Sequence, residues 1–199
     1  NTFSAASSNL LTSCTCHAGY KGANGTECTL CPLNTFSTAS STLITSCTCL
    51  AGYTGADGEE CTPCVGGKWK SVNGSAACTS CGVNTYSSAV AATAQTTCSQ
   101  CSQNTVSVVG STVCTCRAGY TGPDGTECTA CGAGTWKSDT GSTACILCGE
   151  NYFSTELAAV AETTCSSCPS NSISAVGSFM CSCQAGYTGN GTTECTHCG

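Results

Sequence analysis

The chain has little charge, few aromatic side chains and no long hydrophobic run. Charged residues make up 8% and aromatic residues 6% of its 199 positions, whereas Ser and Thr together account for nearly a third. Such a composition cannot fill one large apolar core, so we do not expect a single globular domain.

Basic residues are scarce: five Lys and Arg stand against eleven Asp and Glu, a formal net charge of −6. No basic patch is available for phosphates, so nucleic acid is not expected as a partner. No stretch approaches the roughly 18 continuous apolar residues of a membrane helix, so no membrane span is expected. The chain opens on Asn1 without a signal peptide, and we expect any targeting or anchoring segment to lie outside it.

Cysteine is abundant, with 24 residues in the chain, which is typical of a disulfide scaffold. Small units without a core depend on covalent staples, each of which stabilises by about 2–4 kcal/mol. Disulfides at this density persist only in an oxidising compartment. The composition therefore predicts an extracellular protein, secreted or at the cell surface.

Internal repeats organise the chain. Residues 1–20 return at residues 34–53 with sixteen identical positions, and the cysteine pattern of residues 78–131 returns 67 residues later. This periodicity predicts four units: 1–31, a short unit with a truncated start; 32–64, a second short unit; and two long units, 65–131 and 132–198. The expected fold is small, disulfide-rich and loop-dominated with short β-hairpins, forming an elongated tandem-repeat rod.

Each loop carries Asn or Gly at the third position after its opening cysteine. These residue types tolerate positive φ best, so we interpret them as turn residues rather than ligands. Two Ala-rich stretches, 87–97 and 154–164, are expected to form one helical turn each. The turn positions are Asn34, Gly67, Asn84, Asn104, Gly134, Asn151 and Asn171, and Asn1 occupies the same place.

Four loops share the pattern C-x-x-G-Y-x-G followed by a turn and Glu-Cys. Their glycines permit a tight reversal that brings the flanking cysteines within bridging distance. The predicted disulfides of these GY loops are Cys16 with Cys28, Cys49 with Cys61, Cys116 with Cys128, and Cys183 with Cys195.

At these residues the chain resembles the C-terminal half of an EGF-like module. The wider C-x-x-C…C-x-C-x-x-G-Y pattern resembles ephrin-receptor-like cysteine-rich repeats, with a looser likeness to tumour-necrosis-factor-receptor repeats. The EGF-like order implies bridges from Cys81 to Cys101 and from Cys98 to Cys114, with Cys64 joined to Cys78. The acidic cluster of calcium-binding EGF modules is missing, so calcium is not expected.

A simple ladder, Cys81 to Cys98 and Cys101 to Cys114, is equally compatible with the sequence. Both patterns leave Cys14 and Cys198 to pair outside the chain. A crossed pattern, Cys14 to Cys28 and Cys16 to Cys31, would pair all 24 cysteines.

Three N-x-[ST] sequons, at Asn24, Asn73 and Asn190, fall in Gly-rich turns and are candidate N-glycosylation sites. Structural zinc is disfavoured despite the repeated C-x-x-C, because GY loops and sequons indicate an oxidised scaffold. No catalytic, cofactor-binding or metal site is predicted, so the chain is not expected to be an enzyme. Trp69 and Trp136 recur 67 residues apart, which favours packing against a disulfide over a ligand platform.

Two functions remain open. Near-copy repeats and low charge favour a structural glycoprotein, a segment of a filament, a flagellar-hair-like fibre, a sheath or a cell-wall or matrix assembly. Its expected partners are copies of itself or other matrix and filament proteins, with covalently attached glycans. The alternative is the stalk or ligand-binding ectodomain of a cell-surface receptor or adhesin.

Overall fold

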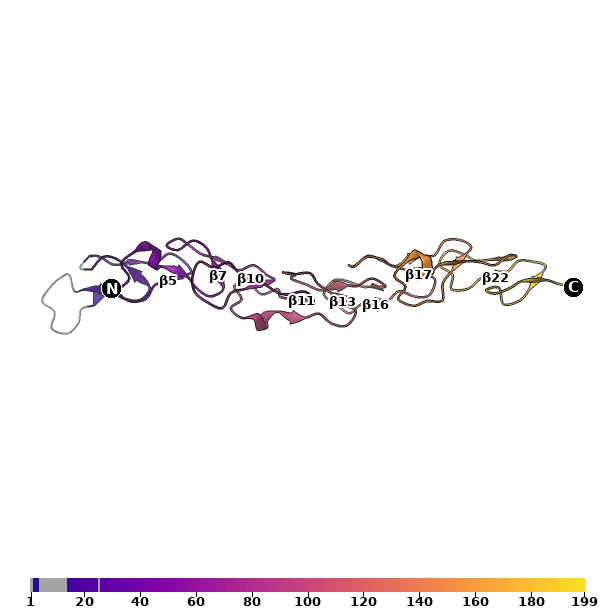
Figure 1. Cartoon of the computed structure of the whole chain (residues 1–199), viewed down its shortest axis with the longest axis horizontal. Coiled ribbons are helices and arrows are strands. Elements are labelled where there is room, and N and C mark those ends of the chain that lie inside the picture. The colour runs from indigo at the N-terminus through magenta and orange to yellow at the C-terminus, as the bar shows by residue number, and fades with distance from the viewer. Residues whose placement is uncertain (1, 4–13, 25) are drawn as a thin grey trace. The chain divides into compact units, whose positions relative to one another are not determined.

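The fold is a succession of two-stranded antiparallel hairpins (Figure 1). It is known from a computed structural model, which describes residues 2, 3, 14–24 and 26–199. The chain forms two compact units: unit 1 contains residues 1–100 and 108–112, and unit 2 contains residues 101–107 and 113–199. The predicted disulfide-rich, loop-dominated fold with short hairpins is confirmed.

In unit 1, every described strand is two residues long and pairs with its sequence neighbour. The hairpins are β1 (Thr2–Phe3) with β2 (Thr15–Cys16), β3 (Tyr20–Lys21) with β4 (Thr29–Leu30), β5 (Thr35–Phe36) with β6 (Thr48–Cys49), β7 (Tyr53–Thr54) with β8 (Thr62–Pro63), β9 (Lys68–Trp69) with β10 (Thr79–Ser80), and β11 (Thr85–Tyr86) with β12 (Ser99–Gln100).

Unit 2 repeats this plan. Its hairpins are β13 (Thr105–Val106) with β14 (Thr115–Cys116), β15 (Tyr120–Thr121) with β16 (Thr129–Ala130), β17 (Thr135–Trp136) with β18 (Ile146–Leu147), β19 (Tyr152–Phe153) with β20 (Ser166–Ser167), β21 (Ser172–Ile173) with β22 (Ser182–Cys183), and β23 (Tyr187–Thr188) with β24 (Thr196–His197).

Helical structure in the described residues consists of single 3-10 turns. They are η2 (Ile44–Ser46), η3 (Gln95–Thr97) and η4 (Glu162–Thr164). The turns η3 and η4 end the two Ala-rich stretches in which the sequence predicts a helical turn. None of the helices in the described segments has the length and apolar character needed to cross a membrane.

Turn residues precede the first strand of seven hairpins in the places that the sequence predicts. Asn34, Asn84, Asn104, Asn151 and Asn171 have φ between 58° and 63°. Gly67 and Gly134 have φ of 78° and 79°. This left-handed conformation favours Asn and Gly, so the predicted turn role is confirmed at all seven positions. Asn1 lies outside the described residues.

Cysteines dominate the apolar interior of the fold. Among the described residues, thirteen of the fifteen buried hydrophobic side chains are cysteines, and the other two are Ala92 and Ala159. Large apolar side chains remain on the surface, for example Val108, which is 75% exposed. Disulfides therefore replace the apolar core that the composition cannot supply.

Successive hairpins within a unit are joined by backbone hydrogen bonds around the GY loops. The N–H of Gly52 donates to the carbonyl of Lys70 at 2.8 Å, and the carbonyl of Gly52 accepts from the N–H of Cys64 at 2.8 Å. Gly119 repeats both contacts, with Lys137 at 2.9 Å and Cys131 at 2.8 Å. Each of these two GY loops thus holds both its own strand partner and the hairpin that follows.

Candidate functional site

The disulfides join consecutive cysteines along the chain. Eleven bridges have sequence separations of 12 to 17 residues, and none encloses another cysteine. The GY-loop bridges are Cys16–Cys28, Cys49–Cys61, Cys116–Cys128 and Cys183–Cys195. The others are Cys31–Cys47, Cys64–Cys78, Cys81–Cys98, Cys101–Cys114, Cys131–Cys145, Cys148–Cys165 and Cys168–Cys181.

The long units adopt the ladder and not the EGF-like order. Cys81 bonds to Cys98 and Cys101 bonds to Cys114, and the crossed pattern that would use Cys14 is also absent from the described residues. The geometry of the C-x-x-C pairs is compatible with this ladder. Strand β12 separates Cys98 from Cys101, and side chains three positions apart in an extended strand face opposite sides. The two sulfurs therefore turn toward successive loops.

Disulfide formation limits what the C-x-x-C pairs can bind. A zinc site needs several thiolates, but every cysteine of these pairs other than Cys198 is oxidised in a disulfide. In the segments that the structure describes, no group of three or more Cys, His, Asp or Glu side chains is placed to hold a metal ion.

Cys14 and Cys198 are free thiols, the first half-buried and the second exposed. Cys198 occupies the position that Cys31 has in the first GY loop. Its N–H donates to the carbonyl of Gly186 at 2.9 Å, as that of Cys31 donates to Gly19 at 3.0 Å.

The three sequon asparagines are exposed. The Oδ1 atom of Asn73 accepts from the N–H of Ala51 at 2.8 Å, and that of Asn190 accepts from the N–H of Thr193 at 2.8 Å. These bonds hold the side-chain oxygens of Asn73 and Asn190. The amide nitrogens of the same two side chains, to which N-linked glycans attach, have no hydrogen-bond partner among the described residues.

Two lysines are buried in a position that sequence reasoning missed. Lys70 is 3% exposed and Lys137 is 2% exposed. Each follows its turn glycine by three residues, and every described hairpin with a turn Asn has a buried serine there. The serines are Ser37, Ser87, Ser107, Ser154 and Ser174. The recurring Asn/Gly-x-x-Ser/Lys pattern is the signal that could have revealed this slot.

The lysine ammonium groups bridge neighbouring loops. Lys70 Nζ donates to the carbonyl of Tyr53 at 2.7 Å and to that of Gly74, and Lys137 Nζ donates to Tyr120 at 2.8 Å and to Gly141. Ser37 Oγ reaches only the equivalent carbonyl of Tyr20, at 2.8 Å. Ser37 contacts the preceding loop alone, whereas each lysine contacts the preceding loop and also a carbonyl of its own loop.

Burial lowers the pKa of Lys70 from its ordinary value, and the nearby carboxylate of Asp57 opposes this shift. Oδ1 of Asp57 is buried and has no hydrogen-bond partner in the described part of the chain. The attraction between the two side chains is thus electrostatic, while the carbonyls satisfy the ammonium group directly.

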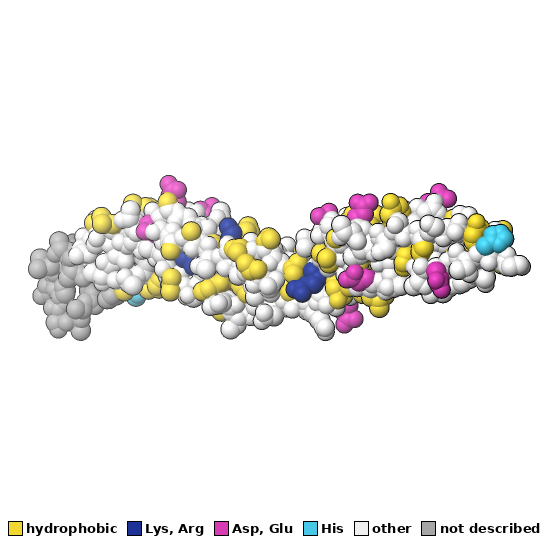
Figure 2. Space-filling view, turned by 45° about the vertical axis from the view of Figure 1, so that its right-hand side comes forward, with side chains coloured by type: hydrophobic (Ala, Val, Ile, Leu, Met, Phe, Trp, Pro, Cys, Tyr) yellow, Lys and Arg dark blue, Asp and Glu magenta, His cyan; other side chains and the backbone are white. Residues whose placement is uncertain are grey.

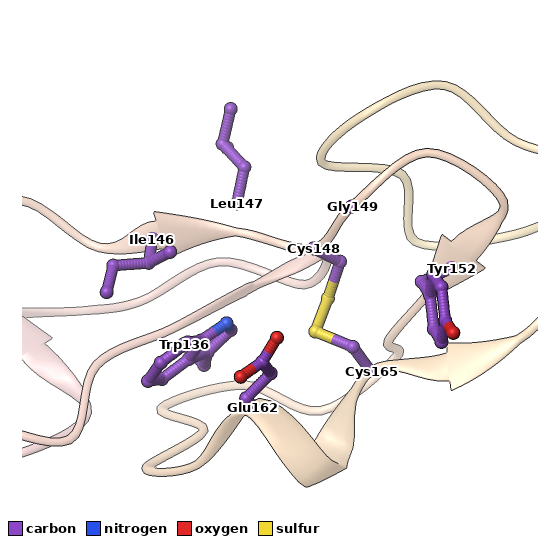
Figure 3. A pocket seen from close by; sticks show the side chains of 8 residues that line it. All are labelled: Trp136, Ile146, Leu147, Cys148, Gly149, Tyr152, Glu162 and Cys165. Atoms are coloured by element: carbon purple, nitrogen blue, oxygen red, sulfur yellow. A yellow bond between two sulfur atoms is a disulfide. The ribbon is translucent and has the colours of Figure 1, made fainter.

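A tryptophan-lined pocket occurs at equivalent places in both units. In unit 2 the pocket has a volume of about 260 Å³ and lies beside Trp136 and the Cys148–Cys165 bridge (Figure 3). In unit 1 the pocket has about 440 Å³ and lies beside Trp69 and the Cys81–Cys98 bridge. Both tryptophans are half-buried, and each forms an isolated bridge with a buried alanine, Ala92 or Ala159.

The rest of the surface is apolar in places and weakly charged. Figure 2 shows hydrophobic side chains scattered over the face in view, with few charged ones between them. Leu30, Leu33, Leu43, Leu157 and Val109 are each at least 60% exposed. Exposed side chains of this kind are available for contacts with other molecules.

Two segments, residues 52–98 and 119–165, match the family model described as tyrosine-protein kinase ephrin type A/B receptor-like. Each match begins at a GY glycine and ends at Cys98 or Cys165, the cysteine that closes the second loop after the GY loop. These two segments are similar to ephrin-receptor-like cysteine-rich repeats. A comparison with curated proteins finds no match.

Ephrin-receptor-like repeats together with eleven disulfides indicate an extracellular or secreted domain. Repeats of this disulfide-rich family are typically not enzymes. The described residues build a succession of covalently closed loops that carry exposed apolar side chains.

Proposed function

We propose that this chain is a structural segment of an extracellular assembly, such as a filament, a flagellar-hair-like fibre, a sheath or a matrix, and that it has no catalytic role. The observation that carries the proposal is the surface. Exposed Leu, Val and Ile side chains lie among few charges, so neighbouring chains would gain apolar contact with little electrostatic repulsion.

The repeats support this role because they offer equivalent surfaces at regular intervals of sequence. The four proposed building segments are the units 1–31, 32–64, 65–131 and 132–198. Partners would be copies of the chain or other matrix proteins, and heterologous contacts, in which two different patches of neighbouring molecules meet, generate open assemblies. Glycans on Asn24, Asn73 and Asn190 would mark faces that stay outside the contacts.

Cys14 and Cys198 fit the same proposal as points of covalent continuation. Cys198 is placed as Cys31 is, and the sequence around Cys14 repeats that around Cys47. Cys31 and Cys47 form a bridge with a Cα–Cα distance of 5.6 Å. We infer that Cys198 and Cys14 bond to further cysteines outside this chain in the same geometry.

Electron microscopy of the native material, isolated without reducing agent and labelled with an antibody to this chain, tests the function. We expect labelled filaments or sheets with a regular repeat. Labelled monomeric ectodomains on membranes, with no assembled material, would contradict the proposal.

The stalk or ligand-binding ectodomain of a receptor or adhesin is the second candidate. The match to an ephrin type A/B receptor-like family model supports it. The same micrographs separate the candidates, because a receptor stalk would appear singly at a membrane surface.

A further inference from the structure

The tryptophan pocket of unit 2 has a lining suited to a ligand. Trp136 and the Cys148–Cys165 bridge form one part of it, and Ile146 and Tyr152 contribute further apolar surface (Figure 3). The carboxylate of Glu162, from η4, is drawn between the indole and the disulfide. It has no ion-pair or hydrogen-bond partner among the described residues.

The equivalent pocket in unit 1 has the same tryptophan and disulfide but different residues at the other lining positions. Trp69 and the Cys81–Cys98 bridge are retained, so the packing role of the tryptophan is the same in both places. Equivalent positions in the two pockets are 67 residues apart, and four of them carry different lining residues. Thr79, Ser80, Thr85 and Gln95 stand where unit 2 has Ile146, Leu147, Tyr152 and Glu162.

The number of acidic residues also differs between the two copies. Residues 71–116 contain no Asp, Glu, Lys or Arg, whereas four exposed acidic residues occupy the corresponding part of unit 2. No Lys or Arg occurs from residue 138 to residue 199. The acidic residues are Asp139, Glu150, Glu156 and Glu162, at the positions of Val72, Val83, Ala89 and Gln95.

An aromatic face beside an unpaired carboxylate attracts organic cations, because the ring quadrupole and the negative charge act together. A volume of about 260 Å³ beside Trp136 and Ile146 accommodates the alkyl stem of a long side chain. The further carboxylates outside the pocket favour a ligand with several positive charges over a single small amine.

We propose that the Trp136 pocket binds a lysine or arginine side chain from a basic segment of a partner polypeptide. The pocket of unit 2 therefore recognises a partner, whereas the equivalent pocket of unit 1 retains only the tryptophan and the disulfide. This inference goes beyond the structural role and does not depend on assembly into filaments.

Fluorescence titration of the oxidised chain tests the pocket. In a Trp69→Phe background, Trp136 is the sole tryptophan and reports on its own site. The probe is a short peptide of alternating glycine and lysine, and the control peptide has every lysine acetylated on Nε. We expect a saturable change with the lysine peptide, weakened by added salt, and none with the acetylated peptide.

Exchange of the two linings gives matched variants. Tyr152→Thr with Glu162→Gln gives unit 2 these two lining residues of unit 1, and we expect affinity to fall about tenfold. The reverse change, Thr85→Tyr with Gln95→Glu in a Trp136→Phe background, should give Trp69 a response to the same peptide. All four side chains lie outside the disulfide core, and disulfide mapping checks that each variant is folded.

Equal affinity for the acetylated peptide, or an unchanged affinity in the Tyr152→Thr, Glu162→Gln variant, would overturn the proposal. Among the Lys and Arg residues in the described part of this chain, Arg117 is the exposed one. A change in Trp136 fluorescence with protein concentration alone, abolished by Arg117→Gln, would overturn the assignment to a different polypeptide in favour of a second copy of this chain.

Discussion

Two lysines show how a single side chain can connect loops that disulfides leave independent. Lys70 and Lys137 stand in a slot that serine fills elsewhere, and each joins the carbonyl of a preceding GY tyrosine to a glycine carbonyl four residues ahead. Both loops are already closed by their own bridges. The lysine therefore fixes one loop against the next and does not close either.

Replacing Lys70 with Met should lower the free energy of unfolding by about 1–3 kcal/mol, because two buried carbonyls lose their donor while the volume is kept. Lys70→Ser should cost less, since Ser37 shows that serine reaches the tyrosine carbonyl. Denaturant unfolding of the oxidised protein measures the change. Lys68→Met, at a half-buried position, is the control, and an equal loss there would contradict the assigned role.

At the level of the hairpin, the GY loop combines two demands on one glycine. Gly119 has φ of 79°, and a Cβ placed on it would overlap the carbonyl oxygen of Ala158 in the loop closed by the Cys148–Cys165 bridge. Gly186 has φ of 86°, but a Cβ placed on it would meet no atom of the described chain within 4 Å. The two equivalent glycines thus separate the effect of backbone strain from the effect of contact with the β19–β20 hairpin.

Gly119→Ala should destabilise more than Gly186→Ala. Both substitutions impose the cost of positive φ, about 1 kcal/mol, but only the first forces the Ala158 backbone to move. Amide hydrogen exchange locates the effect, and we expect faster exchange at Ala158 N–H, which donates to the carbonyl of Cys131, in the Gly119 variant. Equal exchange there in both variants would show that the close approach does not couple the hairpins.

The sequence predicts the hairpin pattern well because local chemistry determines it. Turn asparagines and GY glycines act within a few residues of where they stand, and the 67-residue period repeats them. The pairing of Cys81, Cys98, Cys101 and Cys114 stays open in the sequence because Cys98 and Cys101 are separated by only two residues. Spacing cannot tell which way each sulfur faces until strand β12 is placed between them.

The buried lysines and the pocket lining escape prediction for another reason. Burial of Lys70 depends on carbonyls supplied by two different loops, and sequence periodicity does not show where those carbonyls point. The lining of the Trp136 pocket combines β17, β18, β19 and η4, whose relation appears only in three dimensions.

At the scale of the whole chain, the ladder predicts which cysteines are joined. Partial reduction and alkylation followed by fragmentation mass spectrometry should recover Cys81–Cys98 and Cys101–Cys114 as separate pairs. This approach is needed because Lys and Arg are too few for tryptic cleavage between the bridges. A Cys81–Cys101 or Cys98–Cys114 pair would contradict the ladder.

The pairing of consecutive cysteines also has a consequence for how such a protein is made. The described bridges have sequence separations of 12 to 17 residues, so each can form as soon as its second cysteine enters the oxidising lumen. Closing a short loop costs little conformational entropy, and no described disulfide requires a cysteine that is far away in the sequence. A chain of this type can be oxidised vectorially during synthesis, and lengthening it by further repeats would not make its folding harder.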